Sequence, residues 1–193
     1  MTILISKEKI ITEYRIVNKK MENVKKRSHD MIGLVLAIII FNSIAFIFTK
    51  KRQTTNQIIH IIVFTIALQS LFDHFIEFKY HGYWYFSKKV DFSGLVAHLF
   101  VVPPVNIMFL KWYPFRSSIK KRILYIVIWE VITLTYELIT LLPEPWGYFH
   151  YGWWNLGHTI ILNPILFIIL IKYYKWIVRK EKEAVKQYER GLL

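Results

Sequence analysis

The chain has 193 residues, of which 54% are hydrophobic and 17% aromatic, and its formal net charge is +13. A soluble domain of this length cannot bury so much apolar side chain while leaving 26 Lys and Arg residues in exposed runs, so the composition predicts a membrane protein. Because the sequence contains no cysteine, disulfides, thiolate metal sites and thiol nucleophiles are excluded.

Residues 1–30 are a basic segment that precedes the first long apolar run. Its lysines and arginines flank apolar residues at gaps of four and three, the spacing of one helix face. These residues are Ile10, Tyr14, Val17, Met21 and Val24. The pattern predicts an amphipathic helix lying on an anionic membrane surface, and a solvated helix packed on the cytoplasmic loops fits it equally well.

Five apolar stretches are long enough to cross the bilayer, which takes about 20 residues at about 1.5 Å rise per residue. They cover residues 31–49, 58–78, 94–113, 123–142 and 156–177. Pro103 and Pro104 remove two backbone donors within the third stretch, so we expect a kinked or broken helix there. Pro164 removes one donor within the fifth stretch, where we expect a kink. The predicted fold class is an all-α polytopic membrane bundle over residues 31–178, followed by a basic tail at 179–193.

The basic residues give a divided prediction of orientation. Counted over alternate loops, 15 Lys and Arg lie on the face that holds the C-terminus and 11 on the other. The excess predicts a cell-membrane protein with its C-terminus inside and its N-terminus outside. The first apolar stretch alone, with more basic residues before it than after it, predicts the opposite.

Ionisable residues gather at the ends of apolar stretches that share one membrane face, because consecutive spans alternate in direction. These residues are Asp73, His74, Glu77, His98, Glu137 and His158. Helical spacing places Gln69, Asp73 and Glu77 in one polar stripe. A second stripe consists of Glu130, Thr133, Glu137 and Thr140. The loops at this face, residues 79–93 and 143–155, are rich in aromatic residues, which suit the lipid headgroup layer.

Several functions remain open for these polar residues. A charge at the bilayer centre costs about 2.5–3.5 kcal/mol even on the insertion scale, so each carboxylate needs a proton or a partner. The groups then either join helices through hydrogen bonds that include Asn106 and Asn163, or line a pocket for a proton-coupled ligand, a cationic ligand or a lipid headgroup. An accessory subunit, whose polar stripes meet another membrane protein or a second copy of the chain, is a further alternative.

An enzyme is the less favoured interpretation. A membrane-embedded hydrolase would use Asp73, His98 and His158 as metal ligands and Glu137 as general base or acid. The sequence has no compact metal motif, nucleophile elbow or phosphate-binding glycine loop, and it identifies no cofactor. The expected partners are the bilayer and its anionic headgroups. Nucleic acid is not expected, since juxtamembrane lysines already have an electrostatic role.

The stretch 60–175 resembles a family of small multi-pass membrane proteins of spore-forming bacteria. The similar segments are LFDHFIEFKY, HGYWYF, VVPPVNIMFLKWYPF, IWEVITLTYELI and GYFHYGWWNLGHTIILNP. The positions that map onto its recurring pattern are Pro104, Asn106, Tyr113, Glu137 and Trp154. The resemblance implies an integral membrane protein of about five helices, and it implies no activity.

Overall fold

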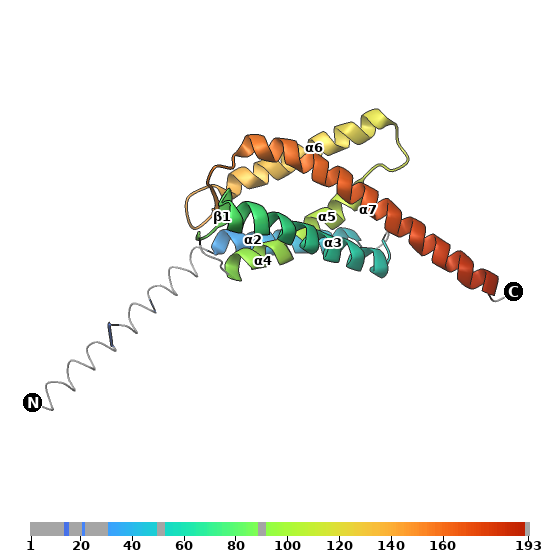
Figure 1. The fold of residues 1–193 in the computed structure, drawn as a ribbon, viewed down its shortest axis with the longest axis horizontal. Helices are drawn as coiled ribbons and strands as arrows, with labels where there is room; N and C mark the ends of the chain where they lie inside the picture. Colours follow the sequence, from blue (N-terminus) through green and yellow to red (C-terminus); the bar gives the residue numbers. More distant parts are fainter. Residues whose placement is uncertain (1–13, 16–20, 22–30, 50–52, 89–91, 192–193) are drawn as a thin grey trace, which may run out of the picture.

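The computed structural model describes residues 14–15, 21, 31–49, 53–88 and 92–191. The predicted amphipathic helix of residues 1–30 lies almost entirely outside these residues. The helices are α2 (Ile32–Thr49), α3 (Thr55–Asp73), the π-helical turn η1 (His74–Lys79), α4 (Phe92–Phe100), α5 (Val102–Trp112), α6 (Ile119–Thr140) and α7 (Leu156–Gly191). Figure 1 shows them lying lengthwise beside one another, which confirms the all-α bundle.

Within the part of the chain that the structure describes, four helical segments are long and apolar enough to cross a membrane: Thr55–Lys79, Ser93–Trp112, Ile119–Thr140 and Leu156–Gly191. The first predicted span corresponds to a shorter apolar helix, Ile32–Phe48. Large apolar side chains on the outside of the bundle are exposed, for example Ile40, Val63 and Val131. Such surfaces suit a lipid environment, because lipid tails are as apolar as an outward-facing isoleucine or valine.

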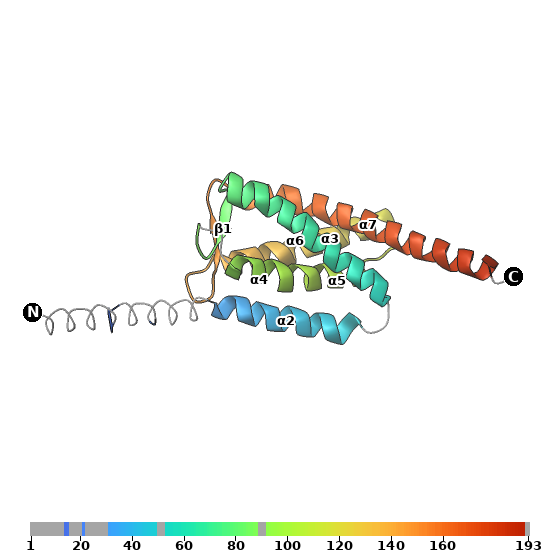
Figure 2. The same cartoon turned by 60° about the horizontal axis from the view of Figure 1, so that its bottom comes forward.

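The helices surround α5. Both α2 and α3 pack against it, while α7 packs against α6 and α3 (Figure 2). Thr54 starts α3 with a capping box, in which its side chain accepts from the Gln57 backbone N–H and the Gln57 side chain accepts from the Thr54 backbone. Such a cap fixes the residue at which a helix begins. From there α3 continues to Asp73 at the other end of the bundle.

The prolines of the predicted third span separate two helices, as the sequence predicts. α4 ends at Phe100, and Pro103 and Pro104 occupy the first turn of α5, where their missing N–H groups cost no intrahelical hydrogen bond. α7, in contrast, continues through Pro164 and on to Gly191, so the predicted basic tail is an extension of this helix.

The two aromatic loops pair with each other at one end of the bundle. Strand β1 (Tyr83–Tyr85) runs antiparallel to β2 (Phe149–Tyr151), with Trp84 opposite His150. Gly152 makes this approach close, because a Cβ there would lie 2.2 Å from the His81 carbonyl oxygen. The sequence predicted aromatic loops at this face but not their pairing. For brevity we call the pair of strands the hairpin, although α4, α5 and α6 separate the two strands along the chain.

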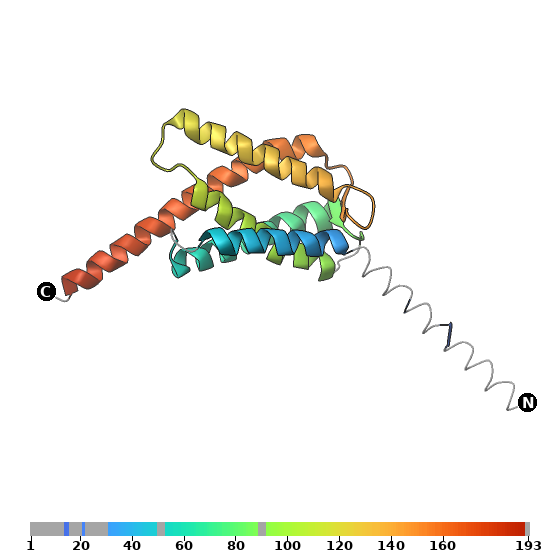
Figure 3. The ribbon, with the colours of Figure 1, turned by 180° about the vertical axis from the view of Figure 1, so that it is seen from behind.

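Two apolar clusters occupy opposite ends of the bundle. The cluster near the hairpin centres on Leu34, Ala97, Val101 and Tyr148. The larger cluster lies toward the other end and is built around Phe109, with Ile61, Trp129, Phe167 and Leu170. Seen from behind, α5 and the loop to α6 lie at that end (Figure 3). The polar site described below lies near the hairpin, and the larger apolar cluster fills the bundle beyond it.

Candidate functional site

Asp73 is the last residue of α3 and is 2% exposed. Its Oδ1 accepts hydrogen bonds from Gln69 Nε2 at 3.1 Å and from the Tyr83 hydroxyl at 2.7 Å. Gln69 lies one turn earlier on the same helix face, and Tyr83 comes from β1. Its Oδ2 has no hydrogen-bond partner among the described residues. One oxygen of Asp73 is thus fixed in place while the other is left open.

Glu77 follows one turn later, within the π-helical turn η1, and is also buried. In this turn the Tyr80 N–H donates to the Phe75 carbonyl five residues earlier. Glu77 Oε1 accepts from the Tyr85 backbone N–H at 3.4 Å, while Oε2 has no hydrogen-bond partner in the described part of the chain. π-Helical turns inside helices frequently occur at functional sites. Glu77 repeats the arrangement of Asp73, with one oxygen held and one free.

His98 reaches the same point from α4 and is 7% exposed. Its Nδ1 lies 3.1 Å from Asp73 Oδ2, but Oδ2 forms no hydrogen bond, so the two atoms are close without hydrogen-bond alignment. Its Nε2 also has no hydrogen-bond partner among the described residues. The ring packs edge-on against Tyr85, with centroids 4.6 Å apart. A buried imidazole nitrogen without a hydrogen-bond partner is unusual, because buried polar atoms in proteins are nearly always paired.

Asp73, Glu77 and His98 together form what we call the acid–histidine cluster. Each offers one ligand atom, and these atoms all lie within 4.8 Å of one another. In a tetrahedral zinc site, metal–ligand bonds of about 2.0–2.2 Å place neighbouring ligand atoms roughly 3.3 Å apart. The 3.1 Å between His98 and Asp73 matches that separation.

A cavity of about 220 Å³ adjoins this cluster. His98, Tyr83 and Tyr85 line one side, and Glu137 and Thr159 line another. Further in, a cavity of about 190 Å³ shares Gln69, Thr133 and Asn163 with the first and extends to Asn106 and Thr65. No Lys or Arg is present among the described residues that line either cavity. A row of polar groups thus leads from the hairpin into the bundle, surrounded by helices that are apolar outside.

Glu137 is the acidic residue on the opposite wall. Its Oε1 accepts from the Tyr151 hydroxyl and, at 2.9 Å, from the Thr159 hydroxyl. Tyr151 belongs to β2 and Thr159 to the first turn of α7, so this carboxylate joins α6 to two other elements. Hydrogen bonds of this kind join neighbouring helices, and here two donors pair with a half-buried acceptor.

The remaining polar residues of the bundle also connect helices. Asn163 Nδ2 donates to Thr133 Oγ1 at 3.3 Å and to Glu130 Oε1 at 3.5 Å, which links α7 to α6. Asn106 Nδ2 donates to Thr65 Oγ1 at 3.0 Å, which links α5 to α3. Glu130 Oε2 is a buried oxygen without a hydrogen-bond partner in the described residues, but Glu130 belongs to no group of three potential metal ligands in that part of the chain.

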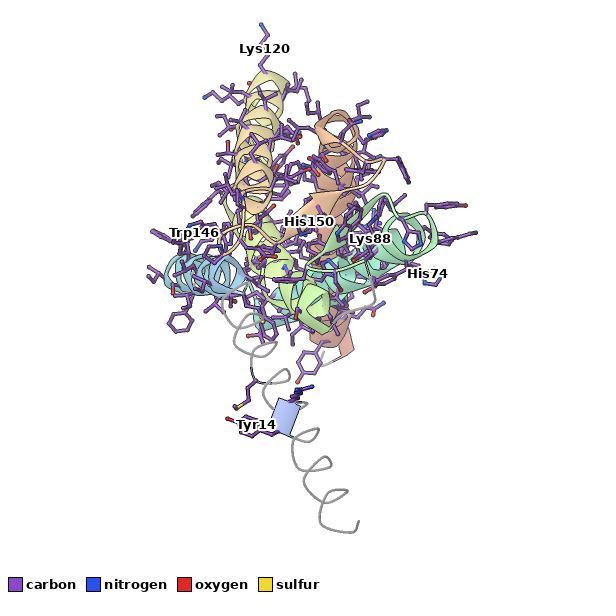
Figure 4. The ribbon with its side chains drawn as sticks, turned by 90° about the vertical axis from the view of Figure 1, so that its left-hand side faces the viewer. Tyr14, His74, Lys88, Lys120, Trp146 and His150 are labelled. Carbon is purple, nitrogen blue, oxygen red and sulfur yellow. The ribbon has the colours of Figure 1, made fainter. Side chains whose placement is uncertain are left out.

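Two predicted histidines lie away from the acid–histidine cluster. His74 is exposed and points out of the bundle, as Figure 4 shows in a view onto the hairpin end. His158 is exposed as well, stacks on Trp154 and accepts at Nδ1 from the Asn155 backbone N–H at 3.3 Å. Of the three predicted metal ligands Asp73, His98 and His158, the structure brings the first two together and adds Glu77.

The sequence interpretation missed the tyrosines that complete the site. Tyr83 orients Asp73, and Tyr85 supplies a backbone donor to Glu77 and a ring edge to His98. Tyr83 and Tyr85 are two residues apart, on either side of Trp84, and in a β-strand residues two apart point to the same face. A short strand at this position would therefore have indicated that both tyrosines face the site. Burial raises the pKa of Tyr83 and of Tyr85 well above the ordinary value of 10, and the nearby Asp73 carboxylate raises both further. Both hydroxyls are therefore donors at neutral pH.

Comparisons with family models, with curated proteins and with solved structures found no match to this chain. The function is therefore inferred from the geometry of the site.

Proposed function

We propose that this chain is an integral membrane protein that binds a divalent metal ion in the acid–histidine cluster, near one membrane face. The observation that carries the proposal is the pair of half-satisfied carboxylates. Asp73 and Glu77 each have one oxygen held by protein donors and one left open beside His98. Metal sites are built in this way, because outer hydrogen bonds orient the ligands while the inner lone pairs bind the ion.

Charge supports a cation as the occupant. Two ionised carboxylates and a neutral imidazole carry a charge of minus two, and no Lys or Arg lines the adjoining cavities among the described residues. Buried charges are costly unless they are paired or bind a metal. A divalent ion neutralises the site, whereas a monovalent ion leaves one negative charge uncompensated.

The ligand types favour zinc or manganese. Imidazole nitrogen with two carboxylate oxygens is a set that both ions accept, while Ca²⁺ and Mg²⁺ prefer sites made of oxygen alone. Three protein ligands leave a coordination position toward the cavity of about 220 Å³. A water molecule or a small anionic ligand fits that position.

Binding suits the structure better than free conduction or hydrolysis. The apolar cluster around Phe109 fills the end of the bundle beyond the polar cavities. Glu137, the predicted general base, is held by two hydroxyl donors on other elements.

Our proposed orientation keeps the C-terminus inside, because its face carries the excess of basic residues. The hairpin and the metal site then lie toward the outer face.

The test is metal binding by the full chain in lipid nanodiscs. After chelator treatment, Zn²⁺ or Mn²⁺ is titrated and the bound metal per chain is measured by mass spectrometry of the metals and by calorimetry. We expect one ion per chain, and a loss of affinity of about 100-fold in Glu77→Gln, which keeps the volume of the side chain but removes its charge.

The matched control is Glu144→Gln, a change at an exposed carboxylate in the loop before β2. It removes the same charge at the same end of the bundle and should leave metal binding unchanged. Equal loss in both variants would mean that overall charge, and not a site, attracts the metal. Absence of stoichiometric binding by the folded wild-type chain would overturn the proposal.

A further inference from the structure

A large basic cavity lies at the end of the bundle opposite the hairpin. Its volume is about 710 Å³, and it lies between the end of α5, the loop that follows it and the middle of α7. Four of the side chains that line it are cationic: Lys111, Arg116, Lys175 and Lys182. No carboxylate is present among the described residues that line it. The cavity is thus opposite in charge to the acid–histidine cluster.

The nearest carboxylates of α7 are engaged elsewhere. Glu181 accepts hydrogen bonds from Thr54 and Gln57 at the start of α3. Glu183 forms ion pairs with Arg179 and Lys180. As a result Arg116, Lys175 and Lys182 have no ion pair with any described residue. Their positive charge is available to a ligand.

Exposed tryptophans place the cavity at the membrane interface. Trp112 follows Lys111 at the end of α5, and Trp176 follows Lys175 on α7, and both are more than one third exposed. Tryptophan is enriched at the level of the lipid headgroups. α7 has 36 residues, more than the roughly 20 that cross the hydrocarbon, so its basic second half leaves the bilayer near this level.

The walls of the cavity are aromatic and its loop is held in place. Phe115 packs against Tyr113 with ring centroids 4.8 Å apart and against Tyr174 with centroids 5.5 Å apart. The Arg122 guanidinium donates to the Phe115 carbonyl oxygen at 2.6 Å, which fixes the loop over the cavity. Apolar rings beside unpaired cations match a molecule that carries both a phosphate and apolar chains.

We propose that this cavity binds the phosphate of an anionic phospholipid, with Arg116 and Lys175 as the principal contacts. A guanidinium binds phosphate oxygens through two parallel hydrogen bonds, and an ammonium adds a point charge. The aromatic walls accommodate the glycerol and upper acyl region. The site is independent of the metal ion proposed above and lies at the other end of the bundle.

The experiment is native mass spectrometry of the full chain released from micelles that contain phosphatidylglycerol or phosphatidylcholine. We compare the wild type, an Arg116→Gln/Lys175→Gln variant and a matched Lys120→Gln/Lys121→Gln variant. Lys120 points away from the bundle at the start of α6 (Figure 4), and neither control lysine lines the cavity. The cavity variant should lose about thirtyfold in affinity for phosphatidylglycerol, and the control less than about twofold.

Each other outcome contradicts the proposal. Equal losses in both double variants would mean diffuse attraction by the basic face, and equal binding of the two lipids would mean that the anionic headgroup is not recognised. Inorganic phosphate is added as a competitor, and full displacement by it would identify free phosphate as the ligand in place of lipid. If the cavity variant does not fold, as judged by its thermal transition, Lys182→Gln alone provides the same comparison.

Discussion

Two groups of carboxylates face the same end of the bundle, and their surroundings differ. On the α6 side, Glu137 Oε1 receives hydroxyl donors from both β2 and α7. On the α3 side, Asp73 and Glu77 each keep one oxygen without a hydrogen-bond donor among the described residues. His98 lies beside them, with its Nδ1 3.1 Å from Asp73 Oδ2 and its Nε2 without a hydrogen-bond partner in the same part of the chain. Glu137 is therefore held by donors from two other elements, whereas Asp73 and Glu77 each keep an oxygen without a donor. Glu130 on α6 also keeps one such oxygen, but it belongs to no group of three potential metal ligands among the described residues.

This difference separates a carboxylate that joins helices, Glu137, from the carboxylates that we propose to bind an ion, Asp73 and Glu77. A buried acceptor that is satisfied by neutral donors costs little and ties helices together. Convergent acceptors with free lone pairs are costly in the empty protein, and an ion repays that cost when it binds. Single substitutions in each group should therefore have different effects on metal binding and on stability.

The largest effect is expected for His98→Ala. The substitution removes the nitrogen ligand of the acid–histidine cluster, so the affinity for Zn²⁺ should fall by about 100-fold or more. Calorimetric titration in nanodiscs measures the change. The control is His74→Ala, since His74 is exposed beside Asp73 in the sequence and should not affect binding. If both variants bind zinc as the wild type does, His98 is not a ligand.

A smaller effect is expected for Tyr83→Phe. Phenylalanine keeps the packing against Phe149 but removes the hydroxyl that donates to Asp73 Oδ1. Loss of such an outer partner typically weakens metal binding by about tenfold. The exposed Tyr80 offers the matched change, Tyr80→Phe, which should leave the affinity unaltered. An unchanged zinc affinity in Tyr83→Phe would show that Asp73 needs no such orientation.

Glu137→Gln should lower the stability of the bundle and leave its zinc affinity almost unchanged. It weakens two hydrogen bonds that join α6 to β2 and α7, so we expect a loss of about 1 kcal/mol in stability, seen as a lower thermal transition. Zinc affinity should change by less than about threefold, because Glu137 is not a ligand. A loss of zinc binding as large as that in His98→Ala would merge the two groups into one site.

The smallest effect concerns alkaline pH. Burial raises the pKa of Tyr83, Tyr85 and Tyr148 well above 10, so these hydroxyls keep their protons in the folded chain while the unfolded chain loses them. The folded state therefore binds more protons above pH 10, and its stability falls as the pH rises past that value. Ultraviolet titration should show fewer tyrosines ionising near pH 10 before unfolding than after it. Full ionisation in the folded protein would contradict the burial of the hairpin.

The sequence was sufficient to predict the helices but not the pairing between loops. Long apolar runs and the Pro103–Pro104 pair identify the spans and the break between α4 and α5, because these signals are local. The hairpin joins residues 83–85 to 149–151, and no local pattern states which strand is the partner. α7 continues past the predicted boundary at residue 178, since its charged second half contains no helix-breaking residue before Gly191.

The candidate site was predictable only in part. Spacing by four placed Asp73 and Glu77 on one face of a helix, and the alternation of spans placed His98 at the same membrane level. The level alone could not separate His98 from His158, which the rotation of α7 leaves exposed against Trp154. The direction in which a helix turns its side chains depends on packing, and that information is not contained in hydropathy.

The central claim is that the acid–histidine cluster coordinates a divalent ion. X-ray absorption at the zinc edge of the zinc-loaded chain in nanodiscs tests it most directly. The account predicts one imidazole together with oxygen ligands in the wild type, and loss of the imidazole signal in His98→Ala but not in His74→Ala. An imidazole signal that persists in His98→Ala, or zinc surrounded only by water oxygens in the wild type, would contradict it.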